Sequence, residues 1–266
     1  MKRNRYLQLV LLLFGVAIIG CRKSPPTSLP NQQEPPKADS LVLDSVLYFE
    51  EDGSGGLETY AYHFEYDSVY RLTGSTMNGK KSFEVTYNGD RLASITKYDN
   101  NEFPYMKVEA PGSLVVAGDS ISFDYEVAGF KMRECFVFAG AELRESRYYQ
   151  YTGDTARDNF SIFYNKYNDE GNVTESVAEF KSGEVPQWTS GEVDNKKNIW
   201  RSMPLAVILD THGSPSYTSV NNITKVIYPN SDVDEYEYTY NNEGYPLTIL
   251  IKRLGFVTTR FVYTRK

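Results

Sequence analysis

Cysteine, histidine and basic residues are scarce in this chain of 266 residues. Two cysteines and two histidines are too few for a disulfide framework or for a histidine-rich metal site. The 28 lysines and arginines are outnumbered by 35 aspartates and glutamates, which gives a formal charge of −7, whereas a nucleic-acid surface needs a basic face. We therefore expect no nucleic-acid partner, no metal and no cofactor.

Local signatures of catalysis are also missing from the sequence. It contains no Gly-x-Ser-x-Gly elbow, and the glycines at 53–56 are not followed by the Lys-Ser/Thr of a phosphate loop. His63 and His212 lie outside any His-Glu-x-x-His spacing. Cys135 stands among strand-forming residues, which favours an inert buried thiol over a nucleophile. We predict no catalytic residue and interpret the chain as a non-enzyme.

The N-terminus combines a basic start with a short apolar run. Three basic residues among the first five precede the apolar stretch 7–19, which is shorter than the roughly 20 residues of a membrane-spanning helix. The run ends in Ile18-Ile19-Gly20-Cys21, which resembles the lipobox of bacterial lipoproteins. The resemblance implies that residues 1–20 are a signal peptide and that Cys21 carries acyl chains such as palmitate. Two or more such chains anchor a protein stably, since each buried methylene contributes about 0.8 kcal/mol.

Residues 21–40 have the composition of a tether. They hold five of the twelve prolines and almost no apolar side chain, so they cannot bury enough surface to fold. Without its signal peptide the chain has 25 basic and 35 acidic residues, a net charge of −10, and an anionic membrane would repel it. The lipid must therefore supply the membrane attachment. Arg22 and Lys23 follow the cysteine, so the chain lacks the acidic run that resembles the surface-export signal of Bacteroidetes-type lipoproteins. We therefore expect the protein on the periplasmic face of the outer membrane.

Residues 41–266 alternate between apolar and polar side chains with a period of two. Tyr60, Tyr62, Phe64 and Tyr66 fall on one face of such a strand, and Thr, Ala, His and Glu fall on the other. This alternation is typical of an antiparallel sheet with one solvated face. No segment shows a convincing helical stripe. We predict one all-β domain, an antiparallel meander of successive hairpins that forms a twisted or rolled sheet.

The predicted turns repeat one pattern of an aromatic residue, an Asp or Asn, usually a Gly, and then a new strand. Asx side chains cap turns, and Gly supplies a positive φ. Where Tyr70 stands in place of Gly, the pattern leaves the turn type open. The segments with this pattern are 64–72, 85–92, 167–173 and 238–247.

These turns resemble the Tyr-Asp repeats of large bacterial surface and toxin-shell proteins. A closer resemblance is to a family of Bacteroidetes lipoproteins that has three sequence motifs near its C-terminus. In this chain the motifs are Asn222-Ile223-Thr224-Lys225, Tyr238-Thr239-Tyr240-Asn241-Asn242-Glu243-Gly244-Tyr245-Pro246 and Phe261-Val262-Tyr263. The resemblance is specific over about residues 195–266 and looser from 57 to 181. It implies an all-β secreted module, and it brings no activity or catalytic residue with it.

One stretch, residues 183–220, breaks the alternation and contains both tryptophans and three prolines. We predict an irregular insert there, with a short helical segment around Leu205–Leu209. A long insert in a β-protein is either a plug over an open end of the sheet or a binding loop. Of the two, the plug is favoured.

Two functions fit the sequence. The first is a lipid-anchored envelope protein whose sheet serves structure or protein contact. The alternative is a carbohydrate-binding lipoprotein in glycan uptake, because exposed aromatic rings stack on sugars. Packing within a tyrosine-rich sheet explains the same aromatics equally simply. The candidate ligand-binding residues are Trp188, Trp200, Tyr148, Tyr149 and Tyr151.

Overall fold

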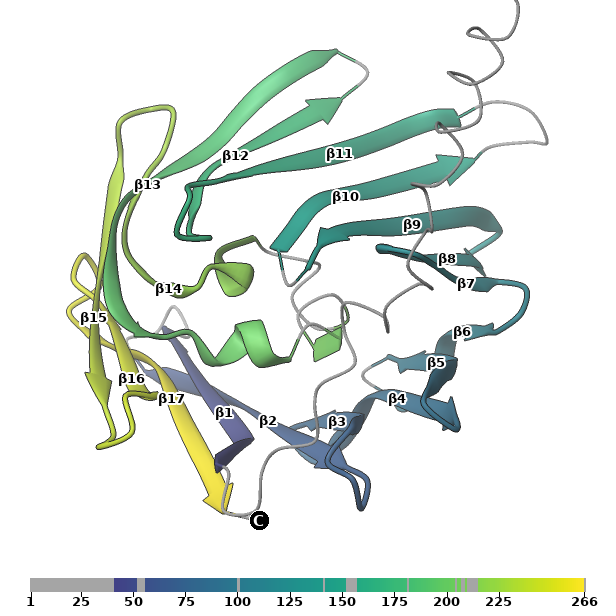
Figure 1. Cartoon of the computed structure of the whole chain (residues 1–266), viewed down its shortest axis with the longest axis horizontal. Helices are drawn as coiled ribbons and strands as arrows, with labels where there is room; N and C mark the ends of the chain where they lie inside the picture. The colour runs from purple at the N-terminus through teal and green to yellow at the C-terminus, as the bar shows by residue number, and fades with distance from the viewer. Residues whose placement is uncertain are drawn as a thin grey trace, which may run out of the picture.

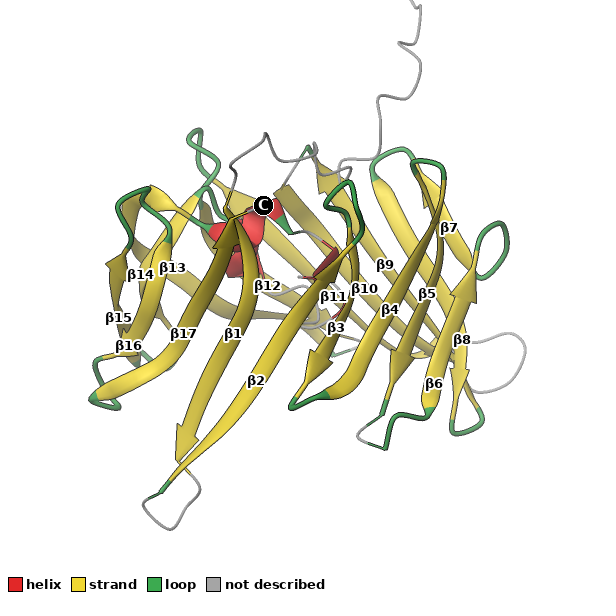
Figure 2. Cartoon of the chain, turned by 90° about the horizontal axis from the view of Figure 1, so that it is seen from below, coloured by secondary structure: helices red, strands yellow, loops and turns green. Residues whose placement is uncertain are grey.

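A computed structural model describes residues 41–51, 56–99, 101–140, 142–151, 157–180, 182–203, 205–206, 209 and 215–265. Within them, 17 strands form one antiparallel sheet that rolls up until it nearly closes (Figure 1, Figure 2). The prediction of an all-β meander is therefore confirmed. No helix in these residues is long and apolar enough to cross a membrane. The predicted signal peptide, Cys21 and the tether lie outside the described residues.

The strands occupy most of the chain from Leu41 onward. The first nine are β1 (Leu41–Glu51), β2 (Leu57–Tyr66), β3 (Leu72–Met77), β4 (Lys80–Asn88), β5 (Arg91–Tyr98), β6 (Pro104–Glu109), β7 (Leu114–Ala117), β8 (Ser120–Val127) and β9 (Phe130–Ala139). The others are β10 (Glu142–Tyr151), β11 (Arg157–Tyr167), β12 (Val173–Phe180), β13 (Gly183–Lys197), β14 (Asn221–Ile227), β15 (Val233–Tyr240), β16 (Pro246–Ile251) and β17 (Phe256–Arg265). Two short 3-10 helices, η1 (Ile199–Ser202) and η2 (Pro215–Thr218), lie between β13 and β14.

The strands follow one another in chain order, and the first strand meets the last. β1 pairs with β2 on one side and with β17 on the other, through seven residue pairs each. The described residues show one interruption, because β6 pairs with β5 and β7 pairs with β8 but no ladder joins β6 to β7. There β6 lies beside β8 instead. The roll is thus closed by hydrogen bonds everywhere except at this seam.

The first part of the predicted insert is a strand. Residues 183–197 form β13, which pairs with both β12 and β14, so the prediction of an irregular segment was wrong there. The ladder shifts register near Pro186 and again at three places against β14. Each shift breaks the period of two, which explains why alternation did not reveal this strand.

Five hairpin turns share one backbone geometry. The first residue donates its N–H to the carbonyl four positions later and accepts at its own carbonyl from the N–H three positions later. In four of them its Asp or Asn side chain also accepts from the N–H groups two and four positions on. Tyr70, with φ +65°, fits the same turn as the glycines, which answers the open question of its turn type. The first residues are Asp67, Asp99, Asn168, Tyr228 and Asn241, and the residues with positive φ are Tyr70, Glu102, Gly171, Ser231 and Gly244.

Tyrosine hydroxyls tie neighbouring strands together in a second repeat. In each case a tyrosine towards the end of one strand donates to a backbone carbonyl in the first half of the preceding strand. The ring can then lie inside the roll while its hydroxyl has a partner, as buried phenols require. The pairs are Tyr66–Leu43 (2.7 Å), Tyr87–Leu72 (2.9 Å), Tyr167–Leu143 (2.9 Å), Tyr238–Ile223 (3.0 Å) and Tyr263–Pro246 (2.7 Å).

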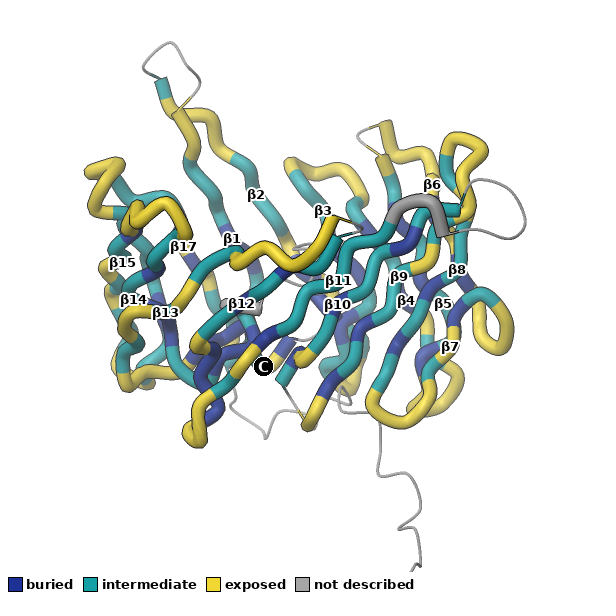
Figure 3. Tube along the Cα trace, turned by 90° about the horizontal axis from the view of Figure 1, so that it is seen from above, coloured by how far each residue is buried: buried dark blue, intermediate teal, exposed yellow. Residues whose placement is uncertain are grey.

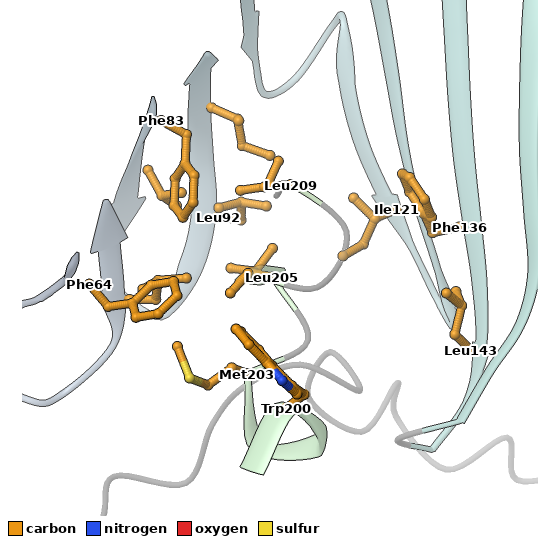
Figure 4. Packing of buried hydrophobic residues seen from close by; sticks show 14 of the residues in the cluster. Phe64, Phe83, Leu92, Ile121, Phe136, Leu143, Trp200, Met203, Leu205 and Leu209 are labelled. Atoms are coloured by element: carbon orange, nitrogen blue, oxygen red, sulfur yellow. The ribbon is translucent and has the colours of Figure 1, made fainter. Parts of the chain in front are cut away.

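The segment between β13 and β14 packs into the interior of the roll (Figure 1), and we call its described residues, 198–203, 205–206, 209 and 215–220, the interior segment. Trp200, Met203 and Leu209 are at most 5% exposed and belong to one cluster with inward side chains of the wall, such as Phe83 and Phe136. Figure 4 shows these side chains converging from both sides of the roll. Burial of one such side chain contributes about 1.5–3 kcal/mol. The described part of this segment therefore packs inside the roll, whereas the plug alternative placed it over an open end of the sheet. Leu205, Ala206 and Leu209 have the predicted helical conformation.

Charged and hydroxyl side chains cover the outer face of the wall. Asp124 on β8 and Arg133 on β9 are cross-strand partners 2.6 Å apart, and each neighbours residues whose side chains point inward. The exposed Thr86 and Ser94 hydroxyls meet at 2.6 Å in the same way. Figure 3 shows buried positions within the strands and exposed ones at the turns. Further ion pairs across this face are Glu145–Arg147, Lys166–Glu175 and Lys252–Glu235.

Candidate ligand cavity

A cavity of about 320 Å³ lies between the inner face of β13–β17 and the interior segment. It separates the main core, which contains Trp200 and Phe261, from a smaller hydrophobic cluster around Val173, Ile223 and Val226. Protein interiors are otherwise packed with few voids larger than a water molecule, and ligand pockets begin at about 300 Å³. The sixteen lining residues are Trp188, Asn198, Trp200, Tyr217, Asn222, Ile223, Val226, Tyr228, Tyr236, Tyr238, Pro246, Ile249, Ile251, Thr258, Thr259 and Phe261.

Aromatic rings from two hydrophobic clusters line this cavity. Trp188 projects inward from β13 and packs on the smaller cluster beside Tyr228 and Tyr236. Trp200, on η1, packs on the main core, with its ring centroid 5.1 Å from that of Tyr217. Both tryptophans of the chain thus line one space.

Asparagine side chains hold the polar part of the lining in place. Asn198 caps η1 by accepting from the Trp200 N–H, and its Nδ2 donates to the carbonyls of Tyr217 and Ser219 at 3.3 and 3.1 Å. The Asn222 Nδ2 donates to Asp194 at 3.1 Å. The Asn198 bonds join the two ends of the interior segment to each other, and the Asn222 bond joins β14 to β13.

Phenol hydroxyls supply most of the remaining polar atoms. Tyr228 donates to Asp234 at 3.2 Å, and Arg253 donates to the other oxygen of the same carboxylate at 2.9 Å. The charge of Asp234 also acts on the neighbouring Tyr236. Burial, the first cause in each case, raises the pKa of Tyr228 and Tyr236, and it raises that of Tyr238 well above its ordinary value. The phenols are therefore neutral at physiological pH.

Raised tyrosine pKa values predict a loss of stability in alkali. Burial raises the pKa of Tyr87 and of Tyr167 from 10 to about 12. The unfolded chain loses these protons near pH 10 and the folded chain near pH 12, so stability is full below pH 10 and falls as pH rises from 10 to 12. A spectrophotometric titration of tyrosinate, followed alongside circular dichroism, should show late-ionising tyrosines that titrate with unfolding. Titration of every tyrosine near pH 10 with the sheet intact would contradict the packing described above.

The predicted ligand-binding residues fall in separate places. Trp188 and Trp200 come together at the cavity. Tyr148 points inward, where its ring packs edge-on to Phe136, while Tyr149 and Tyr151 are its neighbours along the strand and share the opposite face, with ring centroids 6.4 Å apart. A strand turns successive side chains to opposite sides, so the three tyrosines do not form one surface.

His63 and Cys135, two titratable residues that the sequence singled out, do not line the cavity. His63 is exposed on β2, and His212 lies outside the described residues. Cys135 is half-buried on β9, and burial raises the pKa of its thiol. Within the described ranges, no group of three His, Cys, Asp or Glu side chains is placed to hold a metal ion.

Most of the cavity lining was not among the predicted site residues. Tyr236 and Tyr238 alternate with polar residues along β15, and this spacing predicts only that both lie on the same face of a strand. Asn198 and Asn222 carry no local signature, because their role depends on the interior segment folding back against the wall. Only the alternation of tyrosines along one strand could have pointed to the site.

No family model matches the chain, and no curated protein matches it. Two solved structures of porin-like proteins are similar in fold. The protein from Bacteroides vulgatus ATCC 8482 is 10% identical with a TM-score of 0.51, and the alignment covers 84% of this chain and 98% of that one. The protein from Bacteroides uniformis ATCC 8492 is 14% identical with a TM-score of 0.40, at the same coverage. At such identities the likeness shows the fold alone.

Proposed function

We propose that this protein is a lipid-anchored envelope protein whose rolled sheet is a non-catalytic binding body and not a channel. The polarity of the wall carries the proposal, because the main hydrophobic core lies on its inner face whereas its outer face bears ion pairs such as Asp124–Arg133. Charged side chains facing lipid cost about 2–4 kcal/mol each near the bilayer midplane, whereas in water they are well solvated. The body therefore suits an aqueous compartment.

The filled interior supports a binding role over conduction. Side chains of the segment after β13, including Trp200 and Leu209, occupy the space that an ion path would need. What remains is a partly open cavity whose described lining holds no charged side chain, suited to a small uncharged ligand. The lipobox resemblance at Cys21 and the porin-like neighbour from Bacteroides vulgatus agree with a place on the outer membrane. Arg22 and Lys23 favour its periplasmic face.

Lipid labelling and bilayer recording test this proposal together. In a bacterial host that processes lipoproteins, the full chain should incorporate labelled palmitate and sediment with membranes. Cys21→Ala should abolish the label and release the protein, while Cys135→Ala, the matched control, should change neither. Reconstituted in planar bilayers, the full chain should give no conductance steps. Discrete conductance steps, or labelling that survives Cys21→Ala, would refute the proposal. Protease treatment of whole cells should leave the protein intact, and its digestion would contradict the periplasmic face.

A further inference from the structure

We propose that the cavity binds a neutral saccharide of one or two rings between its aromatic walls. The inference rests on the binding role proposed above and names the ligand class. The cavity volume of about 320 Å³ equals that of roughly ten water molecules at about 30 Å³ each. A ligand with one or two sugar rings fills a space of that order.

The aromatic walls match the shape of a sugar. Trp188 and Trp200 belong to different clusters, and the lining also includes four tyrosines and Phe261. A pyranose ring has a flat C–H face, which packs against indole and phenol faces. Such a ring slots between two aromatic walls, while its hydroxyls point outward along the rim of the ring.

The hydrogen-bonding character of the lining favours a ligand rich in donors. Ten of the sixteen lining residues carry a polar side-chain atom. Several of their hydrogens are already used within the protein, such as those that Tyr238 donates to the Ile223 carbonyl and Tyr228 donates to Asp234. The phenol oxygens keep lone pairs that can accept. Sugar hydroxyls can donate to these lone pairs, whereas a hydrocarbon would use none of this hydrogen-bonding capacity.

The charge of the lining excludes ionic ligands. None of the sixteen residues that line the cavity in the described part of the chain is Asp, Glu, Lys, Arg or His. The nearby carboxylate of Asp234 is held by Arg253 and by the Tyr228 hydroxyl behind the lining. An anion or an ammonium group would enter without a counter-charge and would lose its hydration, which is costly. A neutral polyol pays no such cost.

The cavity contains its own spectroscopic reporter, because Trp188 and Trp200 are the two tryptophans of the chain. We would titrate the full chain with glucose, maltose, cellobiose and lactose and follow tryptophan emission and calorimetric heat. At least one of these sugars should give a saturable change in both signals. Glucuronate, which adds a negative charge to the same ring, should bind at least tenfold more weakly than glucose.

Two variants and one control locate the binding. Trp188→Ala should weaken the best sugar tenfold or more, and Tyr236→Phe, which removes one oxygen acceptor, should weaken it about 3–10-fold. Phe103→Ala, at an aromatic residue that is 67% exposed and outside the lining, should leave affinity unchanged. Thermal melting of each variant shows that it is folded. The Tyr236→Phe variant keeps the test valid if Trp188→Ala fails to fold.

Several results would overturn the inference. These are no binding of any of the four sugars, equal binding of glucuronate, or an affinity that both cavity variants leave intact. Tight binding of a fatty acid in place of sugars would also refute it, because it would show an apolar site. If palmitate labelling and the absence of conductance hold while no sugar binds, the envelope role stands and only this inference fails.

Discussion

Replacing Trp200 with alanine should lower the free energy of unfolding by about 3–5 kcal/mol, the range for large aromatic side chains in cores. Trp200 is 5% exposed, and its ring contacts Phe64, Tyr217 and Phe261. These rings belong to different strands of the wall and to η2, so the truncation separates elements that the interior segment holds together. Chemical denaturation of the full chain and of Trp200→Ala, monitored by circular dichroism, would measure the loss.

The control for this prediction is Phe103→Ala. Phe103 is also a large aromatic residue, but it is 67% exposed, so its removal should change stability by less than about 0.5 kcal/mol. A loss under 1 kcal/mol for Trp200→Ala would mean that the interior segment contributes little to the core. The wall would then have to be stable as an empty roll.

Gly171→Ala should be the next most damaging change, at about 2–4 kcal/mol. Gly171 has φ +79°, a conformation that costs an L-residue about 1–2 kcal/mol. A Cβ there would lie 2.9 Å from Val220 Cγ2 and 3.2 Å from Glu142 Oε1, so neighbouring atoms must move. The same turn receives hydrogen bonds at the Gly171 carbonyl from Val220 and Arg201, and these attach the interior segment to the wall.

Gly244→Ala separates the two causes. Gly244 occupies the same position of an equivalent turn with φ +82°, but the nearest atom to an added Cβ is 3.9 Å away. Its replacement should cost only the backbone strain, about 1–2 kcal/mol. Thermal melts of the two variants in parallel should show the larger drop for Gly171→Ala. Equal drops would mean that the contact with Val220 is relieved without cost.

The wall could be predicted from the sequence, because each strand carries its own evidence. Alternation at Tyr60–Tyr66 and the Asp or Asn at each corner are local features, and local geometry decides them. β13 was missed because its register shifts remove the period of two. A residue as unlikely as Tyr70 in a glycine position still forms the turn, since Asp67 fixes it from its side chain.

The cavity could be predicted only in part. Trp188 and Trp200 were among the predicted ligand-binding residues, and both line the cavity. The neighbouring Tyr148 and Tyr149 looked like a patch in the sequence, yet adjacent residues of a strand face opposite ways. The remaining lining depends on the return of the interior segment against β14–β17, a long-range arrangement that no local pattern encodes.

The pairing of β1 with both β2 and β17 determines how the molecule bears a mechanical load. Whatever force reaches Leu41 from the preceding chain enters a strand held by seven residue pairs on each side. A pull along that strand shears both ladders at once, whereas a pull on a sheet edge would peel one bond at a time. The unladdered seam between β6 and β7 lies elsewhere in the roll. The first strand is thus held on both sides where the chain enters the roll, away from the seam that lacks a ladder.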